Sequence, residues 1–305
     1  VADRDNHRIL KFAEGVPAWV QVNVNGFGDK NTWIPTLESY QGYLYVGYWG
    51  STDGTADVWR SPDAETWSNQ SPPWSASNTD VADLHVFDER LYVSTFNATG
   101  GELWRFDGAA WQQVVSNGFG DGNNYGLRAL ATFQGAIYVA TSNDTTGVEV
   151  WRSTTGDAGS WSQVNTDGFG TGGSGQDLSF EVFGGHLYVG LGRGGVGELW
   201  RTDGADWTTV FTNGLGDTNN TNVASFAVFD GQLYIGLRNV VDGGELWRSA
   251  DGLNWNPVFT GGLGDPANGR PYGLIPYDGE LYLTFSNLET GAEVWRSWDG
   301  STWGQ

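Results

Sequence analysis

The sequence predicts an all-β fold, a single β-propeller of four-stranded antiparallel blades, from three observations. A motif of an acidic residue, Leu or Val, Trp and Arg occurs six times, and its Trp recurs at intervals of 45 to 49 residues. Each copy lies among short runs rich in Val, Tyr and Phe, which are separated by turn residues. No stretch keeps an apolar period near 3.6 for more than a turn or two, so we expect almost no helix. Repeats of this length, made of four short strands, are typical of propellers.

Each repeat is expected to contain the same four strands in the same order. The first strand ends at a two-residue turn such as Asp230-Gly231, and a hairpin turn of type I′ needs positive φ at both positions. The second strand carries a Tyr, as at Tyr234, and the fourth begins at a Trp, as at Trp207. The third strand carries the motif, whose tryptophans are Trp59, Trp104, Trp151, Trp200, Trp247 and Trp295.

We expect one propeller domain over residues 1–305. Residues 1–12 resemble the core of an NHL repeat, another family of propeller blades, and residues 1–24 are expected to form a partial blade. The approximate full repeats follow at 25–70, 71–116, 117–166, 167–212, 213–260 and 261–305. This predicts seven blade positions, six complete and one partial, with a six-bladed ring as the alternative. The sequence has neither a starting Met nor a signal peptide, so we expect a mature or excised segment whose incomplete blade offers an edge for self-association.

The third and fourth strands are joined by a turn that places Asp four residues before the fourth-strand Trp and follows it with Gly or Ala. We call this the Asp turn. A carboxylate at this place can accept backbone N–H groups of its own turn and so fix a hairpin. The six copies hold Asp63, Asp107, Asp157, Asp203, Asp251 and Asp299.

Three Asp turns also have Ser two residues before the Asp, at Ser61, Ser249 and Ser297. The pattern Ser-x-Asp-Gly-x-x-Trp resembles the Asp-box, or BNR repeat, of sialidases and other propellers. The resemblance covers every complete repeat, although Arg105 and Arg201 replace the Ser in two copies. It implies that the six aspartates are structural and lie on the face away from the ligand site.

The Arg of each motif follows an acid by three residues, as Arg105 follows Glu102. Side chains alternate along a strand, so these two point to opposite faces of the sheet. We therefore expect pairing between neighbouring strands or blades, and a structural role for the arginines rather than a ring of anion ligands.

Most repeats begin with a loop of the type Gly-Phe-Gly-Asp, as at residues 118–121. Glycines on both sides let the apolar residue fold back as a plug between blades. Acids and amides such as Asp121 and Asn124 follow, and their oxygens are of the kind that Ca²⁺ prefers. Their spacing matches no calcium loop, and Asn and Asp are common turn residues. We predict no cofactor and keep calcium as the alternative.

The charge of the chain limits its partners. Lys and Arg number 15 against 36 Asp and Glu, which gives a formal net charge of −21. Such a surface disfavours nucleic acids and anionic membranes, and no apolar run reaches the ~18 residues that span a bilayer. We therefore predict neither a nucleic-acid partner nor membrane insertion. The acidic charge fits an extracellular or cell-surface protein, and with no cysteines present no disulfide holds the fold.

Function is expected where the repeats differ, in the loops between fourth and first strands and between second and third strands. In a propeller these emerge on one face, which we call the loop face. Aromatic side chains there can stack on a sugar ring or on an apolar patch of a partner. We predict a non-catalytic binding protein for a glycan or protein ligand, with the candidate ligand-binding residues Trp33, Trp49, Tyr125, Arg128, Arg270 and Tyr272.

Two other functions stay open. The Asp-box resemblance makes a sialidase-like glycoside hydrolase the first alternative. That chemistry needs three arginines around the substrate carboxylate, a Tyr nucleophile with a nearby Glu, and an acid–base Asp. The non-motif arginines on the expected loops do not match this pattern residue by residue, and the three histidines do not cluster, so we assign no catalytic residue. The second alternative is a structural unit of a surface layer or filament.

Overall fold

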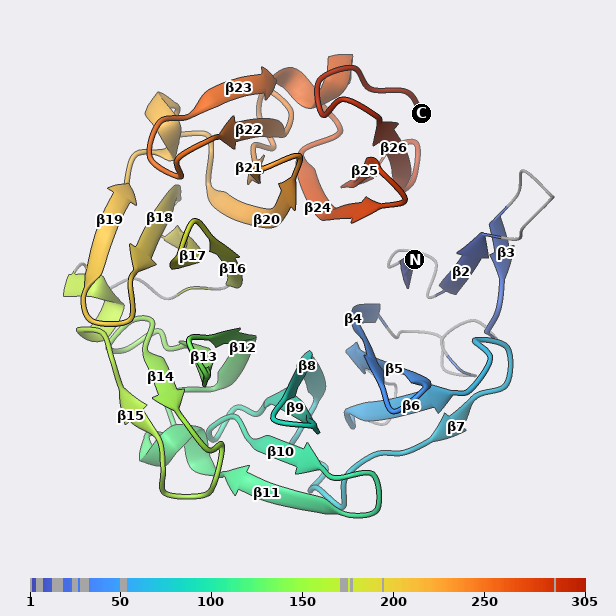
Figure 1. Ribbon diagram of the computed structural model, residues 1–305, viewed down its shortest axis with the longest axis vertical. Helices are drawn as coiled ribbons and strands as arrows, with labels where there is room; N and C mark the ends of the chain where they lie inside the picture. Colours follow the sequence, from blue (N-terminus) through green and yellow to red (C-terminus); the bar gives the residue numbers. More distant parts are fainter. Residues whose placement is uncertain are drawn as a thin grey trace. The chain divides into compact units, whose positions relative to one another are not determined.

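The structure is a computed structural model that describes residues 2–3, 8–12, 19–23, 27, 33–49, 54–170, 175, 178–193, 195–287 and 289–305 (Figure 1). The chain divides into two compact units. Unit 1 comprises residues 1–143 and 149–164, and unit 2 comprises residues 144–148 and 165–305. Every regular element among the described residues is a β-strand or a short 3₁₀ turn, which confirms the all-β prediction. None of the described residues forms a helix long and apolar enough to cross a membrane.

Unit 1 contains a small N-terminal sheet and three four-stranded blades, in which consecutive strands pair antiparallel. The N-terminal sheet consists of β1 (Ala2–Asp3), β2 (Arg8–Phe12) and β3 (Trp19–Gln21). The first blade consists of β4 (Trp33–Tyr40), β5 (Tyr43–Trp49), β6 (Asp57–Ser61) and β7 (Ser68–Asn69). The second consists of β8 (Asp80–Phe87), β9 (Arg90–Phe96), β10 (Leu103–Phe106) and β11 (Trp111–Val115). The third consists of β12 (Gly126–Phe133), β13 (Ala136–Ser142), β14 (Val150–Ser153) and β15 (Ser162–Gln163).

Unit 2 repeats the same arrangement. Its first blade consists of β16 (Ser179–Phe183), β17 (His186–Arg193), β18 (Val196–Thr202) and β19 (Trp207–Phe211). Its second consists of β20 (Asn222–Phe229), β21 (Gln232–Arg238), β22 (Glu245–Ser249) and β23 (Asn256–Phe259). Its third sheet consists of β24 (Arg270–Tyr277), β25 (Glu280–Ser286) and β26 (Glu293–Ser297). In place of a fourth strand, one isolated bridge joins Arg296 to Gly304. The single closed domain and the number of its blade positions stay predictions.

The turns between first and second strands have the geometry that the sequence predicts. Both central residues have positive φ in all six blades, for example 46° at Asp230 and 69° at Gly231. This backbone twist matches the right-handed twist of the flanking strands, as a type I′ turn requires. The turn therefore sets the register of each hairpin.

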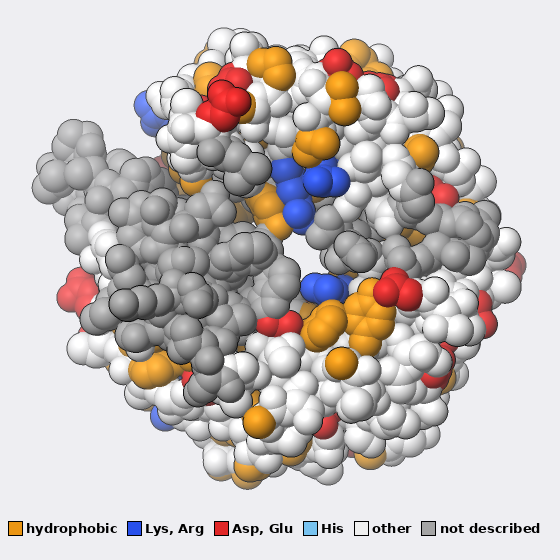
Figure 2. Space-filling model, turned by 180° about the vertical axis from the view of Figure 1, so that it is seen from behind, with side chains coloured by type: hydrophobic (Ala, Val, Ile, Leu, Met, Phe, Trp, Pro, Cys, Tyr) orange, Lys and Arg blue, Asp and Glu red, His pale blue; other side chains and the backbone are white. Residues whose placement is uncertain are grey.

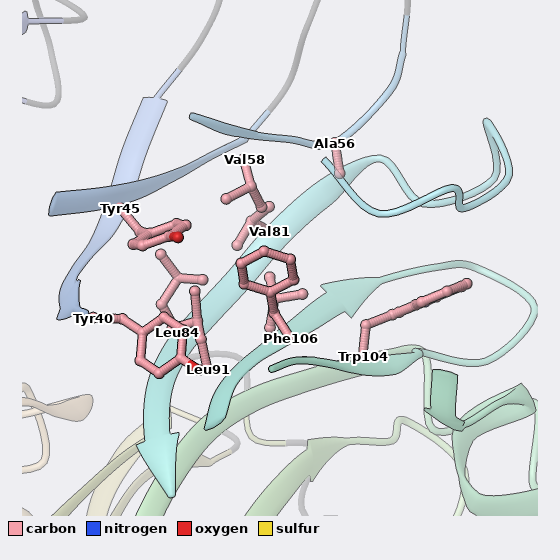
Figure 3. Packing of buried hydrophobic residues seen from close by; sticks show 10 residues of the cluster. Tyr40, Tyr45, Ala56, Val58, Val81, Leu84, Leu91, Trp104 and Phe106 are labelled. Atoms are coloured by element: carbon pink, nitrogen blue, oxygen red, sulfur yellow. The ribbon is translucent and has the colours of Figure 1, made fainter. Parts of the chain in front are cut away.

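The hydrophobic core lies between neighbouring blades rather than within one sheet. Figure 3 shows Tyr40 and Tyr45 of the first blade facing Leu84 and Phe106 of the second. Tyr45 is 1% exposed and its ring centroid lies 6.5 Å from that of Phe106. Within each unit, neighbouring blades thus bury facing surfaces against each other, so these repeats stabilise one another.

The Gly-Phe-Gly loops supply the predicted plugs. In the turn η2 (Asn117–Gly120), Phe119 has a φ of 65° and folds back over the following blade. Its ring stacks on Trp151 with centroids 4.5 Å apart and meets Trp161 edge-on at 5.5 Å. In unit 2, Phe169 makes the same pair of contacts with Trp200 and Trp207. In these two blades the plug fixes the start of the blade against its third and fourth strands.

The Asp turns pack against the preceding blade. A Cβ on Gly156 would overlap the hydroxyl of Tyr92, and one on Gly252 would overlap that of Tyr188. The motif residue Arg105 forms an ion pair of 2.7 Å with Asp157 in the next blade's Asp turn. This contact joins two blades, but its acid belongs to an Asp turn and not to a motif, as the predicted pairing required.

Candidate functional site

The loop face is built on a buried latch that repeats from blade to blade. In unit 1, the fully buried Asn124 donates its Nδ2 to Glu149 Oε2 at 2.8 Å and to the Gly118 carbonyl at 2.9 Å. Glu149 Oε2 also accepts the indole N–H of Trp151 at 2.8 Å. The motif acid therefore binds its own Trp and an Asn of the preceding loop. The equivalent Asn, Glu and Trp residues are Asn78, Glu102 and Trp104; Asn220, Glu245 and Trp247; and Asn268, Glu293 and Trp295.

A second Asn, from the loop between the second and third strands, completes each latch. Asn143 donates to Asn124 Oδ1 at 2.9 Å and to Asp121 Oδ2 at 3.3 Å. The other oxygen of Asp121 accepts the backbone N–H and the side-chain amide of Asn123 at 2.9 and 2.8 Å. The oxygens that suggested calcium thus accept hydrogen bonds from amides. No group of three His, Cys, Asp or Glu side chains within the described ranges could hold a metal ion.

In unit 1 the structure brings two of the predicted site residues, Tyr125 and Arg128, together through the ring of Phe96. The guanidinium carbon of Arg128, near the start of β12, lies 5.1 Å from the ring centroid of Phe96 at the end of β9. Phe96 meets Tyr125 edge-on with centroids 5.1 Å apart, and Arg128 Nε donates to Ser142 Oγ at 3.3 Å. We call Phe96, Tyr125 and Arg128 the unit 1 cluster.

Two further predicted site residues meet in unit 2. Arg270 and Tyr272 lie on either side of Pro271 in β24, where the pairing with β25 shifts its register. The guanidinium carbon of Arg270 lies 3.7 Å from the ring centroid of Tyr272. Arg238 ends β21 next to this pair, because Asn239 N–H donates to the Gly269 carbonyl at 2.9 Å. We call Arg238, Arg270 and Tyr272 the unit 2 cluster.

The remaining predicted residues, Trp33 and Trp49, are opposite each other in the register of β4 and β5. Their side chains lie outside the described part of the structure. Sequence reasoning missed the role of Phe96, since its partner residues belong to the next repeat. The role of Phe96 becomes visible in the backbone pairing of Phe96 with Gly126, which joins β9 to β12.

The Asp turns are held by their own backbone. Asp63 Oδ1 accepts the N–H groups of Thr66 at 2.7 Å and Glu65 at 2.8 Å. These hydrogen bonds favour the ionised form and hold the pKa of Asp63 well below its ordinary value. The N–H groups of Thr302 and Ser301 lower the pKa of Asp299 to about 2 in the same way. The pKa of Asp157 is lowered instead by the Arg105 guanidinium and by Thr155.

One deeply placed carboxyl has a pKa suited to proton transfer. Burial raises the pKa of Asp83 to about 7, and Oδ2 accepts Leu130 N–H at 2.8 Å while Oδ1 accepts Leu84 N–H at 2.9 Å. Thr36 Oγ1 donates to Oδ1 at 3.2 Å. These donors come from β4, β8 and β12, so Asp83 links three blades. The carboxyl is bound as a structural bridge.

The structure resembles solved β-propellers. A protein from Bacteroides fragilis proposed to be a 6-phosphogluconolactonase has a TM-score of 0.64 at 12% identity, with 97% of this chain and 88% of that chain covered. A Trypanosoma rangeli sialidase has a TM-score of 0.58 at 16% identity, with 99% of this chain and 59% of that one covered. A GH74 xyloglucanase from Xanthomonas campestris has a TM-score of 0.59 at 15% identity, with 89% and 45% covered.

The fold is therefore a β-propeller. At these identities the likeness establishes the fold alone. The chain spans 45% of the xyloglucanase and 59% of the sialidase, so the activities of those proteins do not transfer with it. No protein-family profile matches the sequence, and no curated protein is similar to it at a significant level.

Proposed function

We propose that the chain is a non-catalytic propeller that binds carbohydrate through its loop face, outside the cell or at the cell surface. The observation that carries the proposal is the stack of Arg270 on Tyr272, with 3.7 Å between the guanidinium carbon and the ring centroid. An aromatic ring can pack on the C–H face of a sugar, and a guanidinium offers several N–H donors to hydroxyl oxygens. The unit 1 cluster combines the same two kinds of side chain.

Carbohydrate is favoured over a protein ligand by the chemistry of these clusters. Each is small: the unit 1 cluster has one guanidinium and two aromatic rings, and the unit 2 cluster has two guanidinium groups and one ring. Protein interfaces are usually larger and have a hydrophobic centre.

We also propose that the chain is related to the Asp-box propellers of sialidases, because its Asp turns follow the same residue pattern.

The hydrolase alternative has less support in the geometry. Carboxylates beside the two clusters, such as Asp121 and Asp217, accept hydrogen bonds from amides. Asp83, whose pKa of about 7 suits an acid–base residue, is held by backbone N–H groups of two blades. A structural unit of a surface layer or filament needs no cation–aromatic stack, and the described loop residues give it no support over binding.

A glycan array tests the proposal with three proteins. Wild type should bind a subset of glycans, and R270A/Y272A should lose that binding. Y277A is the matched control, because Tyr277 lies at the opposite end of β24 with 69% of its surface exposed. Retained binding by R270A/Y272A, or no binding by wild type at high concentration, would contradict the proposal.

A hydrolysis assay separates binding from catalysis. We expect no turnover of a generic sialoside by wild type. Turnover that disappears in R128A or R270A would replace the non-catalytic proposal with the sialidase-like alternative.

A further inference from the structure

The sequence contains four sites of the pattern Asn-x-Ser/Thr, or sequons, that the proposed function does not use. In a secreted protein this pattern is the acceptor of N-linked glycans. Uncharged polar side chains and backbone make up most of the described surface in Figure 2, and in a chain rich in Asn, Ser and Thr the pattern also arises by chance. The surroundings of each Asn therefore decide which sequon can carry a glycan. The four residues are Asn69, Asn97, Asn143 and Asn219.

Two of the four are parts of the buried latch. Asn97 is 4% exposed and Asn143 is fully buried. Asn97 Nδ2 donates to Asn78 Oδ1 at 3.3 Å, and Asn143 Nδ2 donates to Asn124 Oδ1 at 2.9 Å. At Asn97 the pattern itself is structural, because the N–H and the hydroxyl of Thr99 donate to Asn97 Oδ1 at 3.0 and 2.8 Å. A glycan on either nitrogen would have to displace the surrounding loops and break buried hydrogen bonds.

The third sequon lies on a loop of unit 2, where Asn219 is half-buried. Its Nδ2 donates to Asp242 Oδ2 at 3.0 Å, and its backbone N–H donates to Asp217 Oδ1 at 2.8 Å. The next residue, Asn220, is fully buried, and its Nδ2 donates to Glu245. A glycan on Asn219 Nδ2 would replace one of the hydrogens of that nitrogen beside Asp242, so the folded loop disfavours it.

Asn69 has the opposite surroundings. It ends β7, the two-residue outer strand of the first blade, and both residues of this strand are exposed. Its Oδ1 accepts Ser71 N–H at 2.9 Å, whereas its Nδ2 makes no hydrogen bond within the described part of the chain. Ser71 is held as well, since its Oγ donates to Asp57 Oδ1 at 2.6 Å and accepts Val58 N–H at 3.0 Å. Asn69 thus presents its amide nitrogen to solvent.

The strand that carries Asn69 is also an open edge. β7 pairs with β6 through Trp59 with Asn69 and Arg60 with Ser68, and no described strand pairs with its other side. An unpaired strand edge is a place where chains can associate, and native proteins cover or block such edges. A bulky, solubilising glycan at Asn69 would cover this one.

We propose that the exported, folded chain carries an N-linked glycan at Asn69 and leaves the other three sequons unmodified. The donor class is an oligosaccharide on a polyisoprenyl diphosphate, presented by a membrane-bound transferase. Asn69 Nδ2 forms a bond to the anomeric carbon of the first sugar, while the bond from that carbon to the diphosphate oxygen breaks. The diphosphate leaves with that electron pair, and the amide releases one proton to a base of the transferase. The proposal rests on the proposed location outside the cell and is independent of sugar binding at the loop face.

Secretion of the full chain from cultured animal cells tests the proposal. Enzymatic removal of N-glycans in heavy-oxygen water converts each glycosylated Asn to labelled Asp, which peptide mass spectrometry locates. We expect the label at Asn69 alone. N69Q and S71A should remove the mobility shift of the glycan on a gel, and S71T should keep it because the sequon is retained. N219Q is the matched control and should leave the shift unchanged.

A folded, secreted chain without a glycan at Asn69, or with one at any of the other three sequons, would overturn the inference. Neither result changes the outcome of the glycan array, which tests sugar binding separately. Urea unfolding of each variant excludes loss of fold as the cause. Where little protein is secreted, translation on isolated endoplasmic-reticulum membranes replaces secretion. N69Q should then carry one glycan fewer than wild type, and equal numbers would overturn the inference.

Discussion

At the scale of single residues, the glycine of the Asp turn is required by both backbone conformation and packing. Gly252 has a φ of +72°, where a side chain is strained, and its Cα faces the hydroxyl of Tyr188 in the preceding blade. Gly279 has a similar φ of +77°, but no atom lies within 4 Å of the place where its Cβ would be. The two positions separate the cost of conformation from the cost of contact.

We predict that G252A destabilises the protein more than G279A. Both variants should lose about 1 kcal/mol from the positive φ. G252A should lose about 1–3 kcal/mol more, since its methyl group overpacks against Tyr188. Urea unfolding measures both, and equal losses would show that the turn does not dock as described.

A second residue-scale feature is the half-buried Asp83, whose pKa rises from the ordinary 3.8 to about 7 because its carboxyl is desolvated. The folded state binds this proton more tightly than the unfolded state does. Its contribution to stability is therefore complete below pH 4 and is lost as the pH rises toward 7. Burial raises the pKa of nearby Glu38 in the same direction, whereas it lowers that of His85 to about 4, which costs stability as the pH falls below 6.5.

We predict that D83N flattens the pH dependence of stability between pH 4 and 7. The difference in unfolding free energy between wild type and D83N should change by at most about 1.4 kcal/mol per pH unit across this window, in favour of wild type at low pH. Comparing the two proteins cancels the contribution of His85, whose pKa is shifted by burial and not by Asp83. Parallel curves from urea unfolding at several pH values would contradict this assignment.

At the scale of elements, the strands and turns follow from local sequence, but the latch does not. The motif and the hairpin turns predict which residues form strands, because alternation and positive φ act within a few residues. Asn124 and Glu149 lie 25 residues apart and meet only after two loops fold together. The acids of the motif were therefore predicted to bind arginines, and the buried Asn partners were missed.

We predict that N124A costs about 3–5 kcal/mol of stability, because it leaves Glu149, Asn143 and Thr141 without the partner they share in the core. N123A is the control. Asn123 is exposed, and its described hydrogen bonds go to Asp121. N123A should therefore lower the free energy of unfolding by less than about 1 kcal/mol. Thermal or urea unfolding compares them, and similar losses would show that the latch carries little of the stability.

At the scale of the whole molecule, repetition identifies the scaffold and variation identifies the site. Arg128 and Tyr125 were predicted from their place on the loop face, and the structure joins them through Phe96. Arg270 and Tyr272 were predicted separately and prove to be stacked. The sequence does not predict the register between strands of neighbouring repeats. That register brings the backbone at Arg238 next to the backbone at Arg270.

The acidic charge of −21 has a consequence at this scale. A charge of this sign repels polyanions at long range, whereas contacts within about 8 Å still act at physiological salt.

Amide hydrogen exchange in the presence of a saturating bound sugar tests the central claim most directly. The account predicts slower exchange at residues 238–241 and 269–273, on the loop face of unit 2, with no change in the Asp turns. Protection confined to the Asp turns or to the hairpin at residues 277–280 would place the ligand on the opposite face and contradict it.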